Sequence, residues 1–213
     1  MATAMQRRRS RALPLAIGAS VLAGLWAGAA TAQTLPQESF KALPKALQER
    51  LEGCAACHGE SGVSKLENVP SLAGQPALFL TNQLILMREK LRRVEAMEPF
   101  VKGLKDDEIV ALAEHYAGLP PQPGDDEPVD QTAVARGAEL AQRLLCVSCH
   151  GAKLGGQEQI PRLVPQRLDY LVKSLTEYRD GKRYGVDTSM NGVMYQIPDR
   201  DIRALAHYLR SLR

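Results

Sequence analysis

Two short motifs of cysteine and histidine carry the most specific chemistry in the sequence. Both read C-x-x-C-H, they begin 92 positions apart, and together they contain all four cysteines of the 213-residue chain. In such a motif the two thiols lie on one side of a helical turn and the imidazole follows directly, which suits two thioether bonds to a haem and one bond to its iron. The motifs therefore predict two covalent c-type haem sites, formed by Cys54, Cys57 and His58 and by Cys146, Cys149 and His150.

Two other chemistries could use a C-x-x-C pair. A disulfide or a thioredoxin-like dithiol would need βαβ units, which the sequence does not indicate. A zinc site with four thiolates would need the two pairs brought together across roughly 90 residues, and it would leave both adjacent histidines unexplained. The repeated histidine favours haem over both alternatives.

A haem iron bound by one histidine has a further axial position, which methionine occupies in many cytochromes. Met97 lies 39 residues after His58, and Met190 lies 40 residues after His150. Each methionine stands seven residues before a repeated C-terminal segment, and this shared register predicts Met97 and Met190 as iron ligands. Met194 is the competing candidate in the second half, because it lies four residues nearer to that segment.

Three further residues of ligand type have structural interpretations. Met87 lies within a helical run, where methionine commonly fills a core. His115 and His207 lie among core-spaced residues of the final predicted helices. We interpret all three as packing or surface residues.

The segments that must position the motif residues are themselves repeated. A Pro-x-Leu sequence followed by Gln occurs at 70–75 and again at 161–166, and "LKDDEIVALAEHY" at 104–116 corresponds to "IPDRDIRALAHYL" at 197–209. Apolar residues recur at three- and four-residue spacing, with an aspartate at the start of each final helix, as is typical of amphipathic helices. Neither half contains a convincing strand pattern. The sequence predicts an all-α fold made by duplication of one domain.

A stretch rich in proline and acid divides the two halves. Residues 118–131 contain four prolines, two glycines and four acids, a composition that disfavours helix and sheet alike. We predict an N-terminal domain at 33–119, a linker at 120–131 and a C-terminal domain at 132–213. Domains of this size bury little apolar surface, so a large internal cofactor would stabilise each of them.

Residues 1–32 have the pattern of a secretory signal peptide. Four arginines precede an apolar run that ends in Ala30-Thr31-Ala32, which predicts cleavage before Gln33. The alternative is an uncleaved membrane anchor, because an apolar run of about nineteen residues could just span a bilayer. Export predicts a periplasmic protein, and loose membrane association stays open.

Removal of the export segment changes the charge of the chain. Of 27 basic residues, four lie in that segment, which leaves 23 against 24 acidic residues and a net charge of −1. No basic stripe with interleaved aromatic residues remains, so the composition argues against nucleic-acid binding. The charge is uneven, because residues 131–213 hold 13 basic and 8 acidic side chains whereas 33–120 hold 10 and 12.

From about Phe40 to Arg213 the chain resembles two-haem cytochromes of the class I type, most closely the cytochrome c4 family. The resemblance rests on "CAACHGESG", "PSLAGQPALFL", Met97 and "LKDDEIVALAEHY" in the first half, and on "CVSCHG", Met190 and "DRDIRALAHYL" in the second. It implies two tandem class I cytochrome c domains, packed about a pseudo-twofold axis with haem propionates near their interface. It also implies that the carbonyl oxygens of Pro70 and Pro161 accept a hydrogen bond from Nδ1 of the motif histidines, which fixes each imidazole and raises its basicity.

The halves depart from each other at two places. "LVPQ" in the second half replaces "LAGQ" in the first, and Gly137 has no counterpart in the helix that precedes the first motif. These departures concern local packing and leave the ligand residues unchanged.

Histidine and methionine together would leave no open position on either iron, and methionine favours the ferrous state. The sequence therefore predicts a two-haem electron carrier and not an enzyme, passing electrons towards a terminal oxidase or another respiratory partner. The predicted partners are redox proteins, namely a terminal oxidase, a quinol-oxidising complex or a dehydrogenase.

Two alternatives come from other functional classes. A two-haem redox enzyme such as a peroxidase needs an open iron, and thiosulfate-oxidising cytochromes use a cysteine ligand, whereas all four cysteines here are already assigned. The haem subunit of a flavocytochrome-type dehydrogenase has a similar pattern, and the sequence leaves that reading open.

Overall fold

The computed structural model describes residues 44–212 of the chain. Within that range it consists of helices and loops, and the β contact present is an isolated bridge between Gln157 and Ile160. The all-α prediction is confirmed for these residues. The predicted export segment at 1–32 and its cleavage site lie outside the described residues.

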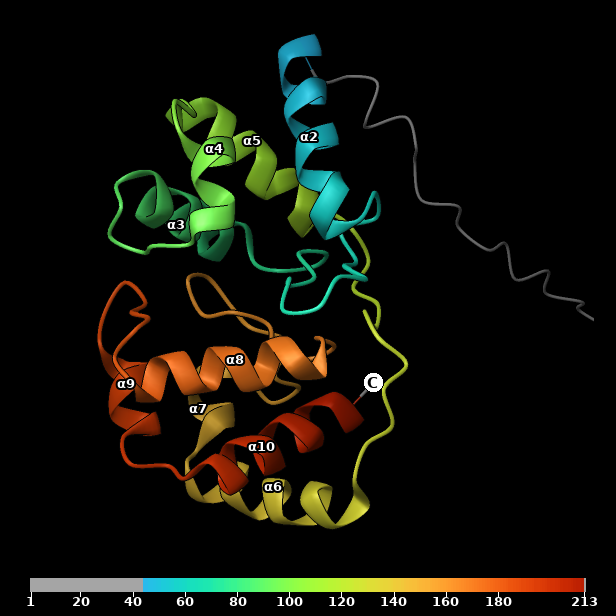
Figure 1. Cartoon of the computed structure of the whole chain (residues 1–213), viewed down its shortest axis with the longest axis vertical. Coiled ribbons are helices and arrows are strands. Elements are labelled where there is room, and N and C mark those ends of the chain that lie inside the picture. Colours follow the sequence, from blue (N-terminus) through green and yellow to red (C-terminus); the bar gives the residue numbers. More distant parts are fainter. Residues whose placement is uncertain (1–43, 213) are drawn as a thin grey trace, which may run out of the picture. The chain divides into compact units, whose positions relative to one another are not determined.

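The first half contains one long helix that ends in the first motif, followed by shorter helices (Figure 1). The helix α2 carries Cys54, Cys57 and His58 on its last turns. In order, the elements are α2 (Lys45–His58), α3 (Ala77–Arg88), the 3-10 turn η1 (Glu95–Met97), α4 (Glu98–Val101) and α5 (Asp106–Ala117).

The second half repeats this order with two changes, one before its motif and one where the single helix α9 replaces η1 and α4. The helix that leads into the motif is split in two, because Leu145 adopts a left-handed conformation with φ of 53°. The elements are α6 (Gln131–Arg143), α7 (Cys146–His150), α8 (Leu168–Arg179), α9 (Ser189–Met194) and α10 (Asp199–Ser211).

Polar residues define the starts of several helices. Asp130 caps α6, since its carboxylate accepts hydrogen bonds from the backbone N–H groups of Thr132 and Ala133. Acidic residues fill the first turns of α5 and α10, which begin at Asp106 and Asp199 as predicted. The repeated sequence pattern thus sets the start of each final helix.

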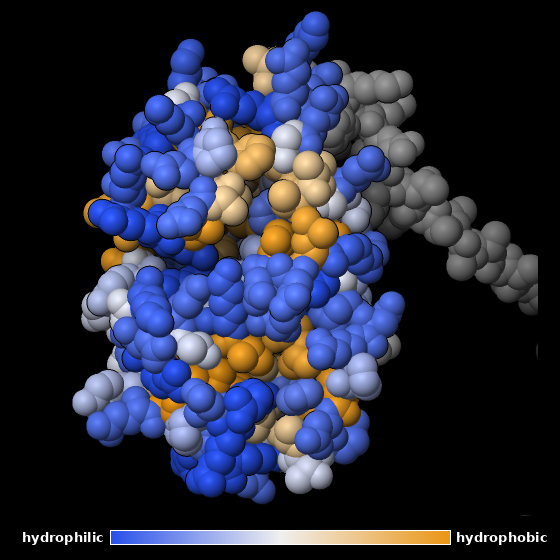
Figure 2. Space-filling view, viewed as in Figure 1, coloured by the Kyte–Doolittle hydropathy of each residue, from blue (hydrophilic) through white to orange (hydrophobic). Residues whose placement is uncertain are grey.

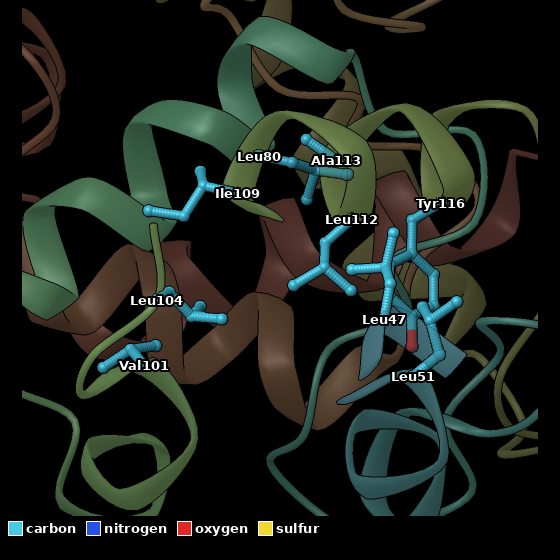
Figure 3. Close-up of a cluster of buried hydrophobic side chains, with 9 residues drawn as sticks. All are labelled: Leu47, Leu51, Leu80, Val101, Leu104, Ile109, Leu112, Ala113 and Tyr116. Atoms are coloured by element: carbon cyan, nitrogen blue, oxygen red, sulfur yellow. The ribbon is translucent and has the colours of Figure 1, made fainter. Parts of the chain in front are cut away.

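The core of the first half is an aliphatic cluster closed by one tyrosine. Figure 3 shows side chains from α2, α3, the segment before α5, and α5 itself pointing towards one another. Its buried members are Leu47, Leu51, Leu80, Val101, Leu104, Ile109, Leu112, Ala113 and Tyr116. The apolar residues at helical spacing therefore form the core that the sequence indicates.

The core of the second half depends on close contact between α6 and α10, which lie side by side (Figure 1). Gly137 is buried at this crossing, where a side chain would collide with the backbone of Ala204. The glycine that lacks a counterpart in the first half thus lets these two helices approach. Buried residues of α8 and α9, among them Leu175 and Met194, complete the cluster.

Two glutamines join the halves by reciprocal hydrogen bonds. Gln75 Nε2 donates to the Arg162 carbonyl at 2.9 Å, and its Oε1 accepts from the Arg162 N–H at 3.0 Å. Gln166 makes the same pair of bonds to Ser71, at 2.9 Å each. Both glutamines are buried. They occupy equivalent positions in the sequence repeat, as do Ser71 and Arg162, so the contact relates the halves symmetrically.

The predicted linker is anchored to the second half. Asp125 Oδ1 accepts from Arg210 Nε at 2.7 Å, and the two side chains are only 9% and 4% exposed. The other carboxylate oxygen of Asp125 accepts from the backbone N–H of Leu168, and Gly124 O accepts from Arg167. Residues 118–130 contain no helix, as their composition indicates, and α6 begins at Gln131, the last residue of the predicted linker. The buried ion pair of Asp125 has no local sequence signal.

The surface is predominantly hydrophilic on the face in Figure 2, with hydrophobic side chains in small separate areas between helices. Among the helices of residues 44–212, none is long and apolar enough to cross a membrane.

Candidate haem sites

Both motif histidines are buried and held in one orientation. His58 Nδ1 donates to the carbonyl oxygen of Pro70 at 2.8 Å, and His150 Nδ1 donates to that of Pro161 at 2.8 Å. Burial lowers the pKa of each histidine, although the proline carbonyl acts in the opposite direction. Each imidazole is therefore neutral with its proton on Nδ1, which leaves the Nε2 lone pair available to bind iron.

A cavity of about 660 Å³ extends along both halves and contains the predicted ligands of each. Aliphatic and aromatic side chains dominate its wall, including Leu80, Leu84 and Leu171. Of the residues predicted from the sequence, Cys54, His58, Pro70, Met97, His150, Pro161 and Met190 line it. An apolar cavity with two neutral imidazoles is the environment that a haem requires.

The two methionine candidates of the second half occupy different environments. Met190 is partly exposed and lines the cavity. Met194 is 1% exposed and packs within the cluster formed by α6, α8 and α10. Asn191 fixes this region, because its Nδ2 donates to the carbonyl oxygens of Tyr178 and Arg183, both at 2.8 Å. This geometry favours Met190 over Met194 as a ligand.

The four cysteines differ in exposure. Cys54 lines the cavity, and burial raises the pKa of its thiol, opposed by a hydrogen bond from Tyr116. Burial likewise raises the pKa of Cys146, whereas Cys149 is exposed. Over residues 44–212 no group of three or more histidine, cysteine or acidic side chains is close enough to hold a metal ion, so the four-thiolate zinc alternative has no geometric support.

Two arginines, one from each half, mark the polar part of the cavity. Arg92 donates to Gln83 Oε1 at 2.6 Å, and Arg183 donates to Ser174 Oγ at 2.6 Å. Arg92 and Arg183 are 91 positions apart, as are Gln83 and Ser174, so the arrangement is repeated. Arg183 also lies 4.9 Å from the ring centre of Tyr178 and bonds to the Tyr170 hydroxyl at 3.1 Å.

Three basic residues of the second half, Arg179, Lys182 and Arg183, lie close together in the sequence and are candidates to hold haem propionates. Arg179 instead pairs with Asp180 and Asp199, and Lys182 lies 3.7 Å from Asp180 at the surface. Only Arg183 of the three lines the cavity. Its counterpart in the first half, Arg92, is not among the residues predicted from the sequence. The repeat indicates it, because Arg92 precedes Arg183 by 91 positions, as Gln75 precedes Gln166.

The other two histidines lie away from the cavity wall. His207 Nδ1 accepts a hydrogen bond from the backbone N–H of Asp130 at 3.2 Å. His115 makes an edge-to-face contact with Tyr116, with ring centres 5.2 Å apart. These contacts suit the structural interpretation that the sequence favours.

In the second half, the residues present fit a haem by a test independent of the motif. Arg183 is 5% exposed, and its buried Nε has no hydrogen-bond partner among the described residues. A buried guanidinium without an acidic partner is costly unless an anion compensates it. The propionate of a haem held by the motif residues supplies such an anion, and the hydrophobic wall suits the porphyrin.

The comparisons with known proteins agree with this site. Residues 44–115 match the family described as "Cytochrome C oxidase, cbb3-type, subunit III", and residues 134–213 match "Cytochrome c". The chain is 31% identical to cytochrome c4 of Thiocapsa roseopersicina over 182 residues, which cover 79% of this chain and 92% of that protein. It is 32% identical to the thiosulfate dehydrogenase electron acceptor of Thiomonas intermedia, over 73% of this chain and 76% of that protein.

A solved structure extends the agreement to the fold. Reduced recombinant cytochrome c4 from Pseudomonas stutzeri superposes with a TM-score of 0.72 at 27% identity, covering 79% of this chain and 97% of that one. With a C-x-x-C-H motif in each half, these similarities show two covalent haem c groups and a role in electron transfer rather than catalysis. The chain belongs to the cytochrome c4 family.

Proposed function

We propose that this chain is a periplasmic electron carrier in which both haem irons are closed, the first by His58 and Met97 and the second by His150 and Met190. The observation that carries the proposal is the cavity, on which both pairs lie together. Bound haem supplies one-electron chemistry between ferrous and ferric iron. The protein binds each haem, orients it and shields it from water.

Each group of residues has a distinct part in this proposal. The four cysteines attach the cofactors covalently, and the carbonyl oxygens of Pro70 and Pro161 keep the imidazoles oriented and basic. Arg92 and Arg183 balance the propionate charge, which lowers the cost of burying it. The hydrophobic wall excludes water, and a closed coordination sphere leaves no position for a substrate.

Intact mass and metal analysis test the cofactor assignment. The exported protein should exceed its polypeptide mass by two haem groups, and acid–acetone should not extract them. Cleavage before Gln33 should appear in the same spectrum as the loss of residues 1–32. A mass with one haem, or zinc in place of iron, contradicts the proposal.

The second half offers a surface for an acidic redox partner. Its exposed basic residues among those described are Arg136, Arg143, Lys153, Lys173, Lys182, Arg200 and Arg203. Opposite charge on a partner speeds encounter, and salt reduces the gain. The proposed partner is a terminal oxidase or another respiratory complex.

A second candidate function has support from one comparison. The relative from Thiomonas intermedia is named as the electron acceptor of a thiosulfate dehydrogenase. This chain would then take its electrons from a thiosulfate-oxidising enzyme, with the same haem sites and the same basic surface. The two candidates differ only in the donor, so they are compatible with one carrier.

Stopped-flow mixing distinguishes the partners. Reduced protein should be oxidised rapidly by a purified terminal oxidase at low salt, and oxidised protein reduced by a thiosulfate dehydrogenase in the second case. Charge reversal at Lys153 and Lys173 should slow the productive reaction more than reversal at the exposed Lys65 and Lys90 of the first half. Equal sensitivity of both halves, or no salt dependence, argues against docking through the second half.

A further inference from the structure

One peptide group connects each motif histidine to the opposite half of the chain. In the first half, the carbonyl oxygen of Pro70 accepts from His58 Nδ1 at 2.8 Å. The N–H on the other side of that same peptide bond belongs to Ser71, and it donates to Gln166 Oε1 at 2.9 Å. A side chain of the second half is thus hydrogen-bonded to the peptide that holds the first histidine.

The second half has the same arrangement with the roles exchanged. The Pro161 carbonyl accepts from His150 Nδ1 at 2.8 Å, and the N–H of the following Arg162 donates to Gln75 Oε1 at 3.0 Å. Each glutamine is fixed by its second bond, from Nε2 to the carbonyl of the same residue, at 2.9 Å in both cases. A backbone N–H and a backbone C=O at the two ends of the amide set which end is oxygen.

A peptide group transmits polarisation from one end to the other. When its N–H donates to an acceptor, its carbonyl oxygen becomes a better acceptor, and linked hydrogen bonds strengthen one another. A stronger acceptor at Nδ1 makes the imidazole a more basic ligand, which stabilises ferric over ferrous iron. The amide oxygen of each glutamine therefore acts on an iron that the other half holds.

We propose that Gln166 sets the reduction potential of the first haem and that Gln75 sets that of the second, each acting through the peptide after Pro70 or Pro161. Both are positioning residues, and neither touches iron. The proposal rests on the assignment of His58 and His150 as iron ligands. Its consequence is that contact between the halves lowers the potential of both haems.

The two links are not equal in strength. Gln166 Oε1 also accepts from the backbone N–H of Arg167 at 3.0 Å, so its oxygen is shared between two donors. The described hydrogen bonds give Gln75 Oε1 one donor, Arg162 N–H. A shared acceptor bonds less strongly to each donor. Removal of Gln75 should therefore shift the potential of the second haem more than removal of Gln166 shifts that of the first.

The variants Gln166→Met and Gln75→Met test the proposal in the two-haem protein. Methionine keeps the length of the side chain and the net charge, and it removes both hydrogen bonds. Redox titration followed by NMR, with ¹⁵N-labelled histidine, resolves the two haems through the Nδ1–H signals of their histidines. We expect Gln166→Met to raise the potential of the first haem and weaken the His58 Nδ1–H bond, and Gln75→Met to do the same for the second haem and His150.

Each variant is the control for the other. A loosened interface that admits water would move both haems together and would favour the charged ferric state, which lowers the potentials. The proposal is wrong if a variant shifts the potential of the haem in the half that carries the substitution. It is also wrong if both potentials shift together or if neither shifts. If a methionine variant fails to fold, Gln166→Glu replaces it, because the protonated carboxyl can make both bonds and should restore the wild-type potential at acidic pH.

Failure of the ligand assignment has a different signature. If His58 or His150 does not bind iron, the wild-type protein itself lacks a paramagnetic shift on that histidine in the ferric state. If the ligands are as proposed but the glutamines have no influence, wild type and variants share the same shifts and the same potentials. The two outcomes are read from the same samples.

Discussion

Gly137 of α6 lies against the backbone of Ala204 in α10, so that a Cβ on the glycine would be 2.1 Å from the Ala204 carbonyl oxygen and 2.6 Å from Tyr208 Cβ. The nearest atom belongs to the backbone of a helix, so it cannot move aside as the end of a flexible side chain would. The approach of these two helices brings the buried Leu140 and Leu205 into one cluster. The packing of α6 against α10 in the second half therefore requires glycine at position 137.

Substitution Gly137→Ala should destabilise the second half by about 1–3 kcal/mol or more, the usual cost of overpacking. The free energy of unfolding, measured by denaturant titration of the holoprotein, checks this. Gly192 in α9 is a matched control, because its added Cβ would meet nothing within 4 Å. Gly192→Ala should raise the free energy of unfolding by roughly 0.5–1 kcal/mol through helix propensity alone. Equal effects at the two positions would contradict the packing argument.

Loss of Met190 should open the second iron, whereas loss of Met194 should affect only packing. Met190→Leu is expected to remove about half of the near-infrared methionine–iron band, and Met97→Leu the other half, if each iron has one such ligand. Met194→Leu should leave the band intact and cost less than about 1.5 kcal/mol of stability, as volume-conserving core changes do. A band that disappears with Met194 and survives loss of Met190 would refute the register argument.

The ion pair of Asp125 with Arg210 should stabilise the docked linker. Asp125→Ala leaves the guanidinium of Arg210 buried and uncompensated, which costs about 3–5 kcal/mol in comparable sites. The neighbouring Asp126 is exposed and gives a control with the same loss of charge. Thermal unfolding of both variants with full haem content is the measurement, and similar melting temperatures would show that the pair contributes little.

Tyr170 should make the haem potentials depend on pH. Burial alone raises its pKa, but Arg183 and Arg92, together with hydrogen bonds from Ser174 and Arg92, lower the pKa to about 7. The phenolate formed above that pKa adds a negative charge, which stabilises ferric iron, so the potentials fall as the pH rises. Propionates at the same arginines oppose ionisation of the phenol, so the fall begins at or above pH 7.

The variant Tyr170→Phe should flatten this dependence. Tyr184→Phe is the control, because Tyr184 is 50% exposed. Phe79 stands at the position equivalent to Tyr170 in the first half, 91 residues earlier, so the phenol is a feature of the second half. Potentiometric titration from pH 6 to 9 checks the prediction, and an unchanged profile in Tyr170→Phe would assign the dependence to another group.

The sequence predicts those parts of the molecule that depend on local pattern. The motif residues, the helical spacing and the starts of α5 and α10 follow from chemistry within a few positions. The bonds of His58 and His150 to the proline carbonyls are present as the resemblance implies. Met190 faces the cavity and Met194 the core, which supports the register argument, while the iron ligands themselves stay a prediction.

The rest depends on contacts between distant segments, which one sequence does not specify. Gln75 and Gln166 were visible as repeat markers, but nothing local indicates that each binds the backbone of the opposite half. Arg92 looks like a solvated residue until the second half places Tyr170 beside it. Leu145 also gave no signal, because a left-handed leucine has no characteristic sequence pattern.

The exchange of bonds between Gln75 and Arg162 and between Gln166 and Ser71 has the form of an isologous interface, in which the same patch on two subunits pairs with itself. The two halves differ elsewhere, since the second has Tyr170 where the first has Phe79. Each half carries both elements of the contact, one glutamine and one backbone N–H and C=O pair, as each subunit of a homodimer does. The single polypeptide therefore contains a contact with the symmetry of a homodimer interface.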